Sequence, residues 1–221
     1  MGNARPPRAR GGRLVILALD TSSAISVALV DGDEVIAEAS EYAPRSHAEL
    51  LAPMVKSVLA RGDAAGPAIE RIVVGTGPAP FTGLRVGLVT ARTLAFAWSV
   101  PMCGVCSLDA LGAAAGGRVT VVSDARRKEV YWATYGDGVR TAGPFVGSPG
   151  GVKVEGSVVG RGAGLYPDTF APDLAARGEF VDPDPAWLVR VATRLAAEGT
   201  TDFPTVPLYL RRPDVHGVPG A

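Results

Sequence analysis

Two aspartates close apolar runs in the two halves of the chain, and they are the first candidates for chemistry. Asp20 ends the run LVILALD, and Asp124 ends the run VTVVSD. If both strands end at one cleft, the two side chains form a carboxylate pair across it, a pattern used in acid–base chemistry. Alternatively, each carboxylate accepts hydrogen bonds from the turn that follows its strand. The sequence leaves both interpretations open.

Small polar residues and glycines suggest a vestigial nucleotide cleft near these aspartates. Thr21 and Ser22 follow Asp20, and the stretch GRGAG supplies two glycines later in the chain. That stretch lacks the GK[ST] tail of a phosphate loop, so it is a weak nucleotide signal. The basic run at residues 126–128 is either a solvated turn or a contact for phosphate or an acidic partner. The candidate cleft residues are Asp20, Thr21, Ser22, Asp124, Gly162 and Gly164.

His47 and two cysteines are the remaining candidates for metal or redox chemistry. His47 stands at the start of a predicted helix, where a solvated or hydrogen-bonded role is commoner than metal ligation. Cys103 and Cys106 form a CxxC pattern, but they follow a helix and Pro101 in an extended apolar run. In a strand, residues three apart point to opposite faces, beyond disulfide reach. We therefore expect two inert, packed thiols, no metal site and no catalytic residue.

The stretch at residues 72–98 predicts a strand, a tight loop and a helix with an unusually smooth face. Thr82 is the expected N-cap, and small residues recur every fourth position of the helix, which puts them on one face. Such a face packs closely, either on the protein's own sheet or on a partner helix. The four residues are Gly83, Gly87, Ala91 and Ala95.

Other elements follow from apolar alternation and turn residues. In the first half, strands at residues 14–20, 24–30 and 34–43 precede a helix at residues 46–61. Ser46 and Glu49 predict a capping box for this helix, and Gly62 its end. In the second half, strands at residues 119–124, 129–135 and 139–145 repeat that order, and Asp184 and Pro185 begin a later helix. PLYLRR, at residues 207–212, is the last expected element.

This repetition indicates a duplicated α/β fold of the actin/hexokinase/Hsp70 type (ASKHA, RNase H-like), with two subdomains of mixed sheet flanked by helices. We expect a disordered basic leader at residues 1–13, subdomains at residues 14–112 and 113–212, and a flexible tail at residues 213–221. Four arginines lie in the leader, so the rest of the chain carries 18 basic and 22 acidic side chains. A weakly acidic body is poorly suited to hold nucleic acid alone. No apolar run is long enough for a bilayer, and we expect a soluble cytoplasmic protein without membrane contact.

Several motifs together resemble the bacterial TsaB (YeaZ) family, which acts in threonylcarbamoyladenosine (t6A) synthesis in tRNA. ALDTSSAISVAL, SHAELLAPMV, GTGPAPFTGLRVGL, SDARRKEVYWATY, GRGAGLYPD and PLYLR occur in the family's order, from Leu14 to about Arg212. Ala79 departs from the glycine usual in the family. If that position needs a positive φ, the loop is reshaped here.

The resemblance implies a non-catalytic paralogue of TsaD, the transferring subunit. Ser107 and Leu111 align with the two metal-binding histidines of TsaD, and Leu cannot ligate a metal. Thr21 replaces the glycine that nucleotide-binding members place after the strand aspartate. The implied complex contains TsaD in a heterodimer and the ATPase TsaE, and it uses ATP and threonylcarbamoyl-AMP. A homodimer in isolation is compatible with it, and tRNA is expected only through the complex.

The expected partner interface lies on the helices at residues 46–61 and 83–98. Its residues are Leu50, Leu51, Met54, Gly83, Gly87, Ala91 and Ala95. The alternative functions are an ATP-dependent ASKHA kinase or a glycoprotease-like metallopeptidase. The kinase needs a glycine-rich phosphate loop, and the peptidase needs more metal ligands than two distant histidines supply.

Overall fold

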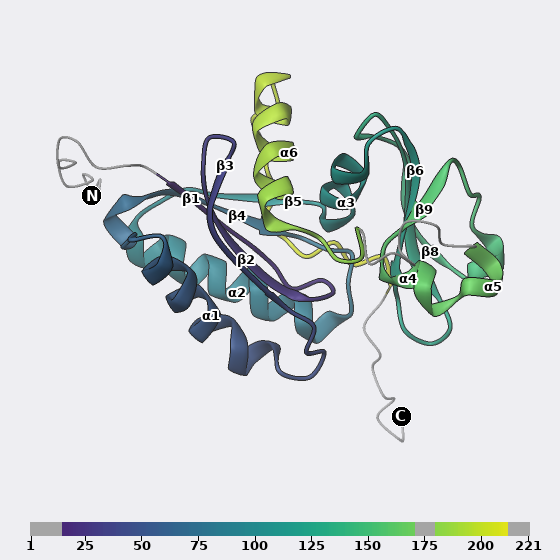
Figure 1. Cartoon of the computed structure of the whole chain (residues 1–221), viewed down its shortest axis with the longest axis horizontal. Helices are drawn as coiled ribbons and strands as arrows, with labels where there is room; N and C mark the ends of the chain where they lie inside the picture. The colour runs from purple at the N-terminus through teal and green to yellow at the C-terminus, as the bar shows by residue number, and fades with distance from the viewer. Residues whose placement is uncertain (1–14, 171–179, 212–221) are drawn as a thin grey trace, which may run out of the picture.

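The computed structural model describes residues 15–170 and 180–211, which form two mixed β-sheets with helices around them (Figure 1). The expected leader at residues 1–13 and tail at residues 213–221 lie outside the described residues. The first sheet contains β1 (Val15–Asp20), β2 (Ile25–Asp31), β3 (Glu34–Glu41), β4 (Ile69–Gly75) and β5 (Met102–Val105). The second contains β6 (Arg118–Asp124), β7 (Val130–Gly136), β8 (Val139–Gly147) and β9 (Ser157–Val159).

The two sheets share one topology. Their strand orders are β3-β2-β1-β4-β5 and β8-β7-β6-β9. In each, an antiparallel meander is followed by a strand parallel to the first one, β4 beside β1 and β9 beside β6. The duplicated actin-like α/β fold expected from the sequence is therefore confirmed. The subdomain division at residues 112–118 stays a prediction.

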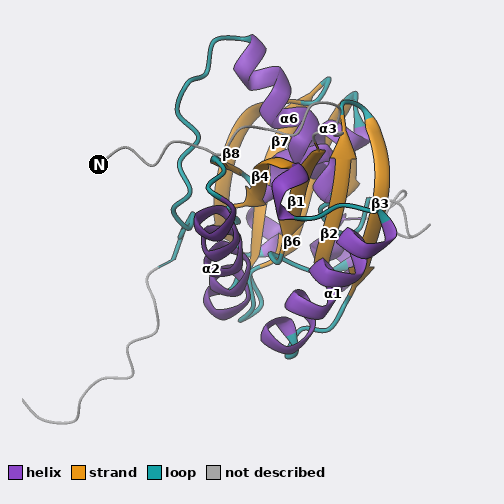
Figure 2. Cartoon of the chain, turned by 90° about the vertical axis from the view of Figure 1, so that its left-hand side faces the viewer, coloured by secondary structure: helices purple, strands orange, loops and turns teal. Residues whose placement is uncertain are grey.

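Helices cover both faces of the first sheet. On one face lie α1 (His47–Arg61) and α2 (Phe81–Trp98), side by side in Figures 1 and 2, and on the other lies α6 (Pro185–Ala197). The alternation within β1 explains this layering, because Leu17 and Leu19 face α1 and α2 while Ala18 faces α6. The strand therefore carries an apolar residue at nearly every position and is buried on both sides.

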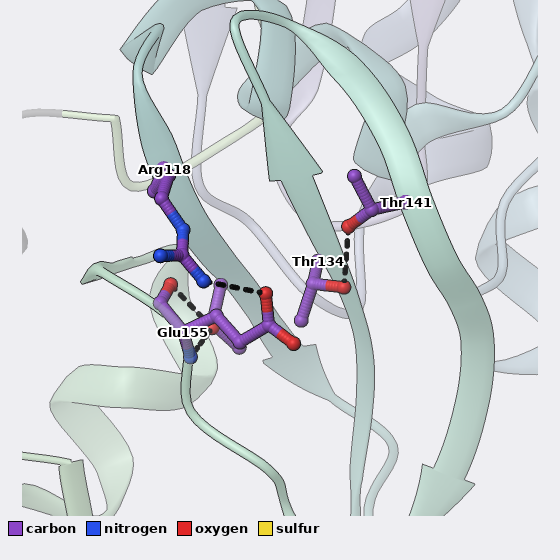
Figure 3. Close-up of polar contacts among 5 residues, drawn as sticks. Arg118, Thr134, Thr141 and Glu155 are labelled. Atoms are coloured by element: carbon purple, nitrogen blue, oxygen red, sulfur yellow. Dashed lines mark hydrogen bonds and ion pairs between the residues drawn. The ribbon is translucent and has the colours of Figure 1, made fainter.

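The second sheet packs mainly on α3 (Ser107–Ala115). Its other face is covered at one end by α4 (Arg161–Leu165) and α5 (Pro167–Phe170). The opposite end of that face carries paired polar groups, as Figure 3 shows: the hydroxyls of Thr134 and Thr141 lie 2.8 Å apart, and Arg118 contacts Glu155 at 3.3 Å. Thr134 is buried, and its hydroxyl is thus hydrogen-bonded, as a buried hydroxyl requires.

A segment without regular structure, residues 200–209, crosses from α6 to α2. We call it the strap. The Gly104 amide donates to the Phe203 carbonyl at 3.3 Å, so the strap covers the outer edge of β5. Further along, the Leu208 amide donates to the Thr76 carbonyl, and the Tyr209 ring stacks on Phe81 with centroids 5.0 Å apart. The strap thereby joins the sheet edge to the start of α2.

Several local predictions need correction. Ser46 precedes α1 but makes no side-chain cap, so the capping box is absent. The N-cap of α2 is Pro80 rather than Thr82. Cys106 is the N-cap of α3, a helix that the sequence analysis missed, and is not a strand residue. PLYLRR forms no described helix or strand, because that part of the chain belongs to the strap region.

Other local predictions are confirmed. α1 ends at Gly62, and the Asp184 carboxylate accepts from the Ala186 amide at the start of α6. Ala79 is not among the residues with positive φ, while Gly77 has φ of 90°. The departure from the family at Ala79 therefore introduces no left-handed strain.

Candidate functional site

A partly open cavity of about 230 Å³ lies where the two sheets meet the first turns of α1 and α2. Its walls come from six places: the β1–β2 turn, the segment after β3, the starts of α1 and α2, the β6–β7 turn and α4. The side chains that matter for its chemistry are Thr21, Ser22, Ser23, Tyr42, His47, Thr82, Asp124, Arg126 and Arg161.

Asp20 is buried behind this cavity and does not line it. Its Oδ1 accepts from the backbone amide and the hydroxyl of Ser22, at 2.7 and 2.5 Å, and its Oδ2 accepts from the Ser107 hydroxyl at 2.5 Å. A Cβ at Gly75 would lie 1.7 Å from the same carboxylate, so that position has to be glycine. Burial raises the pKa of Asp20, although these hydrogen bonds oppose the shift. Asp20 therefore joins β1 to α3.

Asp124 does line the cavity, where it organises the β6–β7 turn. Its Oδ1 accepts from the Arg126 amide at 2.7 Å, and its Oδ2 lies 3.0 Å from the Arg126 guanidinium. Both strand-ending aspartates thus hold the turn that follows them, which supports the turn-capping interpretation. They do not form a pair across the cavity, since only Asp124 reaches it.

The glycines of the predicted cleft lie elsewhere. Gly162 is buried, and a Cβ there would lie 2.9 Å from the Ser123 backbone, while Gly164 has open space around it and does not line the cavity. Arg161, which the sequence analysis did not single out, enters the cavity instead. Thr21 and Ser22 do line it together with Asp124, so three of the six predicted cleft residues meet at this cavity, and their role as a nucleotide cleft stays a prediction.

Arg161 is held by contacts from both halves of the chain. Its guanidinium makes two hydrogen bonds to Asp182 and lies 3.5 Å above the ring of Tyr42. The Ser23 hydroxyl donates to the same Asp182 carboxylate at 2.6 Å. Because these residues are far apart in sequence, no local motif indicates them.

His47 forms part of the cavity wall and is only 9% exposed. Burial lowers the pKa of His47, and Arg126 lowers it further, while a hydrogen bond with the Ser23 backbone opposes them. Neutral imidazole is therefore favoured. The expected first-turn position with a hydrogen bond is confirmed.

The small-residue face of α2 packs on this chain itself. Ala91 and Ala95 are buried, and a Cβ at Gly87 would lie 2.3 Å from the Thr21 hydroxyl oxygen. A Cβ at Gly83 would lie 3.1 Å from the Thr21 carbonyl oxygen. This face of α2 therefore has no room for a partner helix. A partner interface on α2 would have to use a different face of the helix.

The three interface residues predicted on α1 also face inward to different degrees. Leu51 is buried in the core beneath α1, while Leu50 and Met54 are partly buried against the same core. Exposed apolar groups lie instead on the outer side of α2, where Val89 is 59% and Phe96 is 88% exposed. A groove of about 480 Å³ includes Val89 in its wall and is lined by Ala48, Phe81, Thr82, Arg85, Val86, Val89 and Thr90.

Neither cysteine is poised for reaction. Both are free thiols, and burial raises the pKa of Cys106 to about 12 and also raises that of Cys103. In the part of the chain that the structure describes, no three His, Cys, Asp or Glu residues gather as a metal site. No helix within residues 15–170 and 180–211 is long and apolar enough to cross a bilayer.

Comparison with known proteins identifies the family. The family model described as TsaD, tRNA N6-adenosine threonylcarbamoyltransferase, matches residues 36–148. A solved structure entitled YeaZ from Pseudomonas aeruginosa superposes with a TM-score of 0.76 and 31% identity, covering 89% of this chain and all of that one. The chain belongs to the TsaB (YeaZ) family. The resemblance seen in the sequence motifs is thereby confirmed.

Two further relatives show how far the likeness extends. An uncharacterised protein of Mycobacterium bovis is 41% identical over 90% of this chain and 92% of its own length. The tRNA threonylcarbamoyladenosine biosynthesis protein TsaB of Bacillus subtilis is 39% identical over 55% of each chain. The alignment thus spans about half the length of this curated TsaB relative.

Proposed function

We propose that this protein takes part in t6A synthesis in tRNA as a non-catalytic subunit that pairs with a TsaD-like protein. Membership of the TsaB family supports the process. The observation that carries the pairing is the exposed apolar side of α2, where Val89 lines the groove between α1 and α2 and Phe96, further along the helix, is 88% exposed. Large exposed apolar side chains next to a groove are typical of a protein–protein interface.

The buried environment of the former candidate residues supports a non-catalytic role. Ser107 and Leu111, which align with the metal-binding histidines of TsaD, are 0% and 2% exposed and belong to the interior around α3. Asp20 is hydrogen-bonded to its own turn and to Ser107, so it has no access to a substrate. In this proposal, ATP and threonylcarbamoyl-AMP are used by the other subunits, TsaD and TsaE, and tRNA contacts the assembly.

The pairing is tested by placing a charge on the exposed side of α2. Val89→Asp and Phe96→Asp should each weaken binding to the organism's TsaD-like protein by at least about tenfold, because a buried unpaired charge is costly at an interface. The matched control is Val139→Asp on β8, a position that is 52% exposed and far along the chain from α2. Binding is measured by calorimetry and each variant's fold by thermal unfolding. If all three variants bind the TsaD-like protein with equal affinity, the interface does not lie on the exposed side of α2.

Activity is tested by reconstitution. The chain alone should not modify tRNA, whereas adding it to the TsaD-like protein, a TsaE-like ATPase, ATP and threonylcarbamoyl-AMP should switch modification on. The kinase and metallopeptidase alternatives predict the opposite result in isolation, namely stoichiometric ATP or metal binding with turnover. Sedimentation of the isolated chain, with and without Phe96→Asp, shows whether the same surface also makes a homodimer.

A further inference from the structure

The cavity between the sheets combines two guanidinium groups with a single lining carboxylate. Arg126 and Arg161 reach it from the β6–β7 turn and from α4, and Asp124 is the only acidic residue among those that line it. Asp124 engages one nitrogen of Arg126, and Asp182 engages two nitrogens of Arg161. A guanidinium carries five N–H donors, so both side chains keep donors for a ligand.

Two long helices also begin at this cavity. α1 has 15 residues and α2 has 18, and neither N-cap, Ser46 or Pro80, provides a side-chain acceptor for the first turn. The first residues of both helices line the cavity, namely His47 of α1 and Phe81 of α2. Amides and helix dipoles at such ends carry partial positive charge and favour an anion.

The remaining wall mixes polar and apolar side chains. Thr82 provides a hydroxyl group and the nine-tenths buried His47 lines the cavity beside Pro44, Pro80 and Phe81, while the Ser22 and Ser23 hydroxyls already donate to Asp20 and Asp182. Tyr42 lies under the Arg161 guanidinium and fixes its plane. At about 230 Å³ the cavity is smaller than the roughly 300–1,000 Å³ of pockets that hold drug-sized ligands. This size favours a small group over a nucleoside with its phosphates.

We propose that this cavity binds one small oxyanion, of the phosphate or carboxylate type, between Arg126, Arg161 and the first turn of α2. The site differs from a nucleotide cleft, because the two arginines and helix starts match a single anionic group. It also differs from the partner surface on the outer side of α2, so it is tested on the isolated full chain.

Calorimetric titration with inorganic phosphate, at constant chloride concentration, is the direct test. We expect saturable binding with one site per chain. Arg126→Ala should weaken it by at least about tenfold, because a charge-assisted hydrogen bond to the anion is lost. Arg127→Ala is the matched control, because Arg127 is exposed and does not line the cavity. Both residues have a left-handed backbone, with φ of 62° at Arg126 and 54° at Arg127, so alanine has a similar backbone effect at the two positions. The control should stay within about twofold of the unchanged chain.

Two comparison ligands identify the kind of anion. Acetate tests a carboxylate source, and the tighter of phosphate and acetate defines the preferred group. ATP tests a nucleotide source and should bind no more tightly than phosphate. No saturable binding of either small anion, equal weakening by both arginine variants, or ATP binding more than about tenfold tighter than phosphate would each overturn the proposal. Thermal unfolding of Arg126→Ala confirms that its fold is intact, as expected for a side chain that is 54% exposed.

Discussion

The carboxylate of Asp20 is held by three donors from two parts of the chain. Two come from Ser22 in the adjacent turn and one from Ser107 at the start of α3. Ser107 in turn accepts from the Gly77 amide at 3.1 Å, so one buried network fixes β1, the loop before α2 and α3. Aspartate often serves in catalysis, but Asp20 instead holds these three backbone segments in place.

Asp20→Ala should lower the free energy of unfolding by about 2–3 kcal/mol, since it leaves the buried Ser107 hydroxyl and the Ser22 amide without their acceptor. Asp124→Ala serves as the comparison, because it removes one backbone acceptor and a partly exposed ion pair and should cost about 1 kcal/mol or less. Urea unfolding measures both. A cost for Asp124→Ala as large as that for Asp20→Ala would show that burial does not decide the difference.

His47 makes stability depend on pH. Its pKa is lowered by burial and by Arg126, so it lies below the ordinary 6.5 that applies in the unfolded chain. The unfolded state therefore binds the proton more tightly, and the His47 contribution is present above the unfolded pKa of about 6.5 and is lost as pH falls from there through the lower folded-state pKa. We expect His47→Gln to flatten the stability profile between pH 8 and 5.5, measured by urea unfolding. An unchanged slope would mean that His47 is not desolvated in solution.

At the scale of elements, α2 shows that a smooth helix face need not be an interface. The small residues allow α2 to approach the β1–β2 turn, where the Thr21 hydroxyl donates to the Gly83 carbonyl at 2.9 Å. The recurrence of small residues at every fourth position predicts which residues share a helix face. It does not predict which neighbouring element packs on that face. Both alternatives were open in the sequence, and the buried contacts with Thr21 decide between them.

Gly87→Ala should destabilise the isolated chain by about 1–3 kcal/mol. The new Cβ would lie 2.3 Å from the Thr21 hydroxyl oxygen, and the strain of overpacking exceeds the gain of about 1 kcal/mol in helix propensity. Gly164→Ala in α4 is the control, because nothing lies within 4 Å of its Cβ position. Chemical unfolding of the two variants side by side gives the comparison. If Gly87→Ala is neutral or stabilising, α2 has more freedom at this turn than its contacts indicate.

The sequence predicts the strands well because each strand has a strong local signature. The apolar runs that end at Asp20 and Asp124, and the turn at residues 136–138, reproduce the observed β1, β6 and β7–β8 hairpin. α3 was missed because Cys106 and Ser107 continue an apolar run without a stop signal. Its helical state depends on tertiary contacts, including the Ser107 bonds to Asp20 and Gly77.

The candidate cavity was only partly predictable for a related reason. Thr21 and Ser22 follow the end of β1 and Asp124 is the last residue of β6, and the apolar pattern of the sequence predicts both strand ends. Arg161 reaches the cavity through Asp182 and Tyr42, which lie 21 and 119 positions away in the chain, and such pairing leaves no periodic signal. A basic residue inside the GRGAG stretch was the one available indication.

At the scale of the whole molecule, the strap connects parts that the sheets alone leave separate. It contacts β5 through Phe203, and Arg92 of α2 donates to the Thr205 carbonyl at 3.3 Å. Arg211, just beyond the strap, forms an ion pair with Glu129 and donates to the Ala125 carbonyl in the β6–β7 turn. One extended segment thus joins the first sheet, α2 and the second sheet.

Gly104→Ala should displace the strap, because the added Cβ would lie 2.1 Å from the Pro204 carbonyl oxygen. We expect cleavage within residues 200–209 by a nonspecific protease to speed up by about tenfold, as local opening becomes easier. Gly147→Ala on β8 is the control, since its Cβ position has no neighbour within 4 Å. Mass spectrometry locates the cuts. Equal cleavage rates for both variants would show that the strap is not held at β5.

The strap is synthesised well after β5, the strand whose outer edge it covers. A ribosome makes β5 about a hundred residues before Phe203, and at about 5–20 residues per second the gap lasts roughly 5–20 s. During that interval the outer edge of β5 is an open template on which another nascent chain can pair. Closure of that edge is therefore a late event of biogenesis, and we expect chains interrupted before the strap to be the aggregation-prone products of translation.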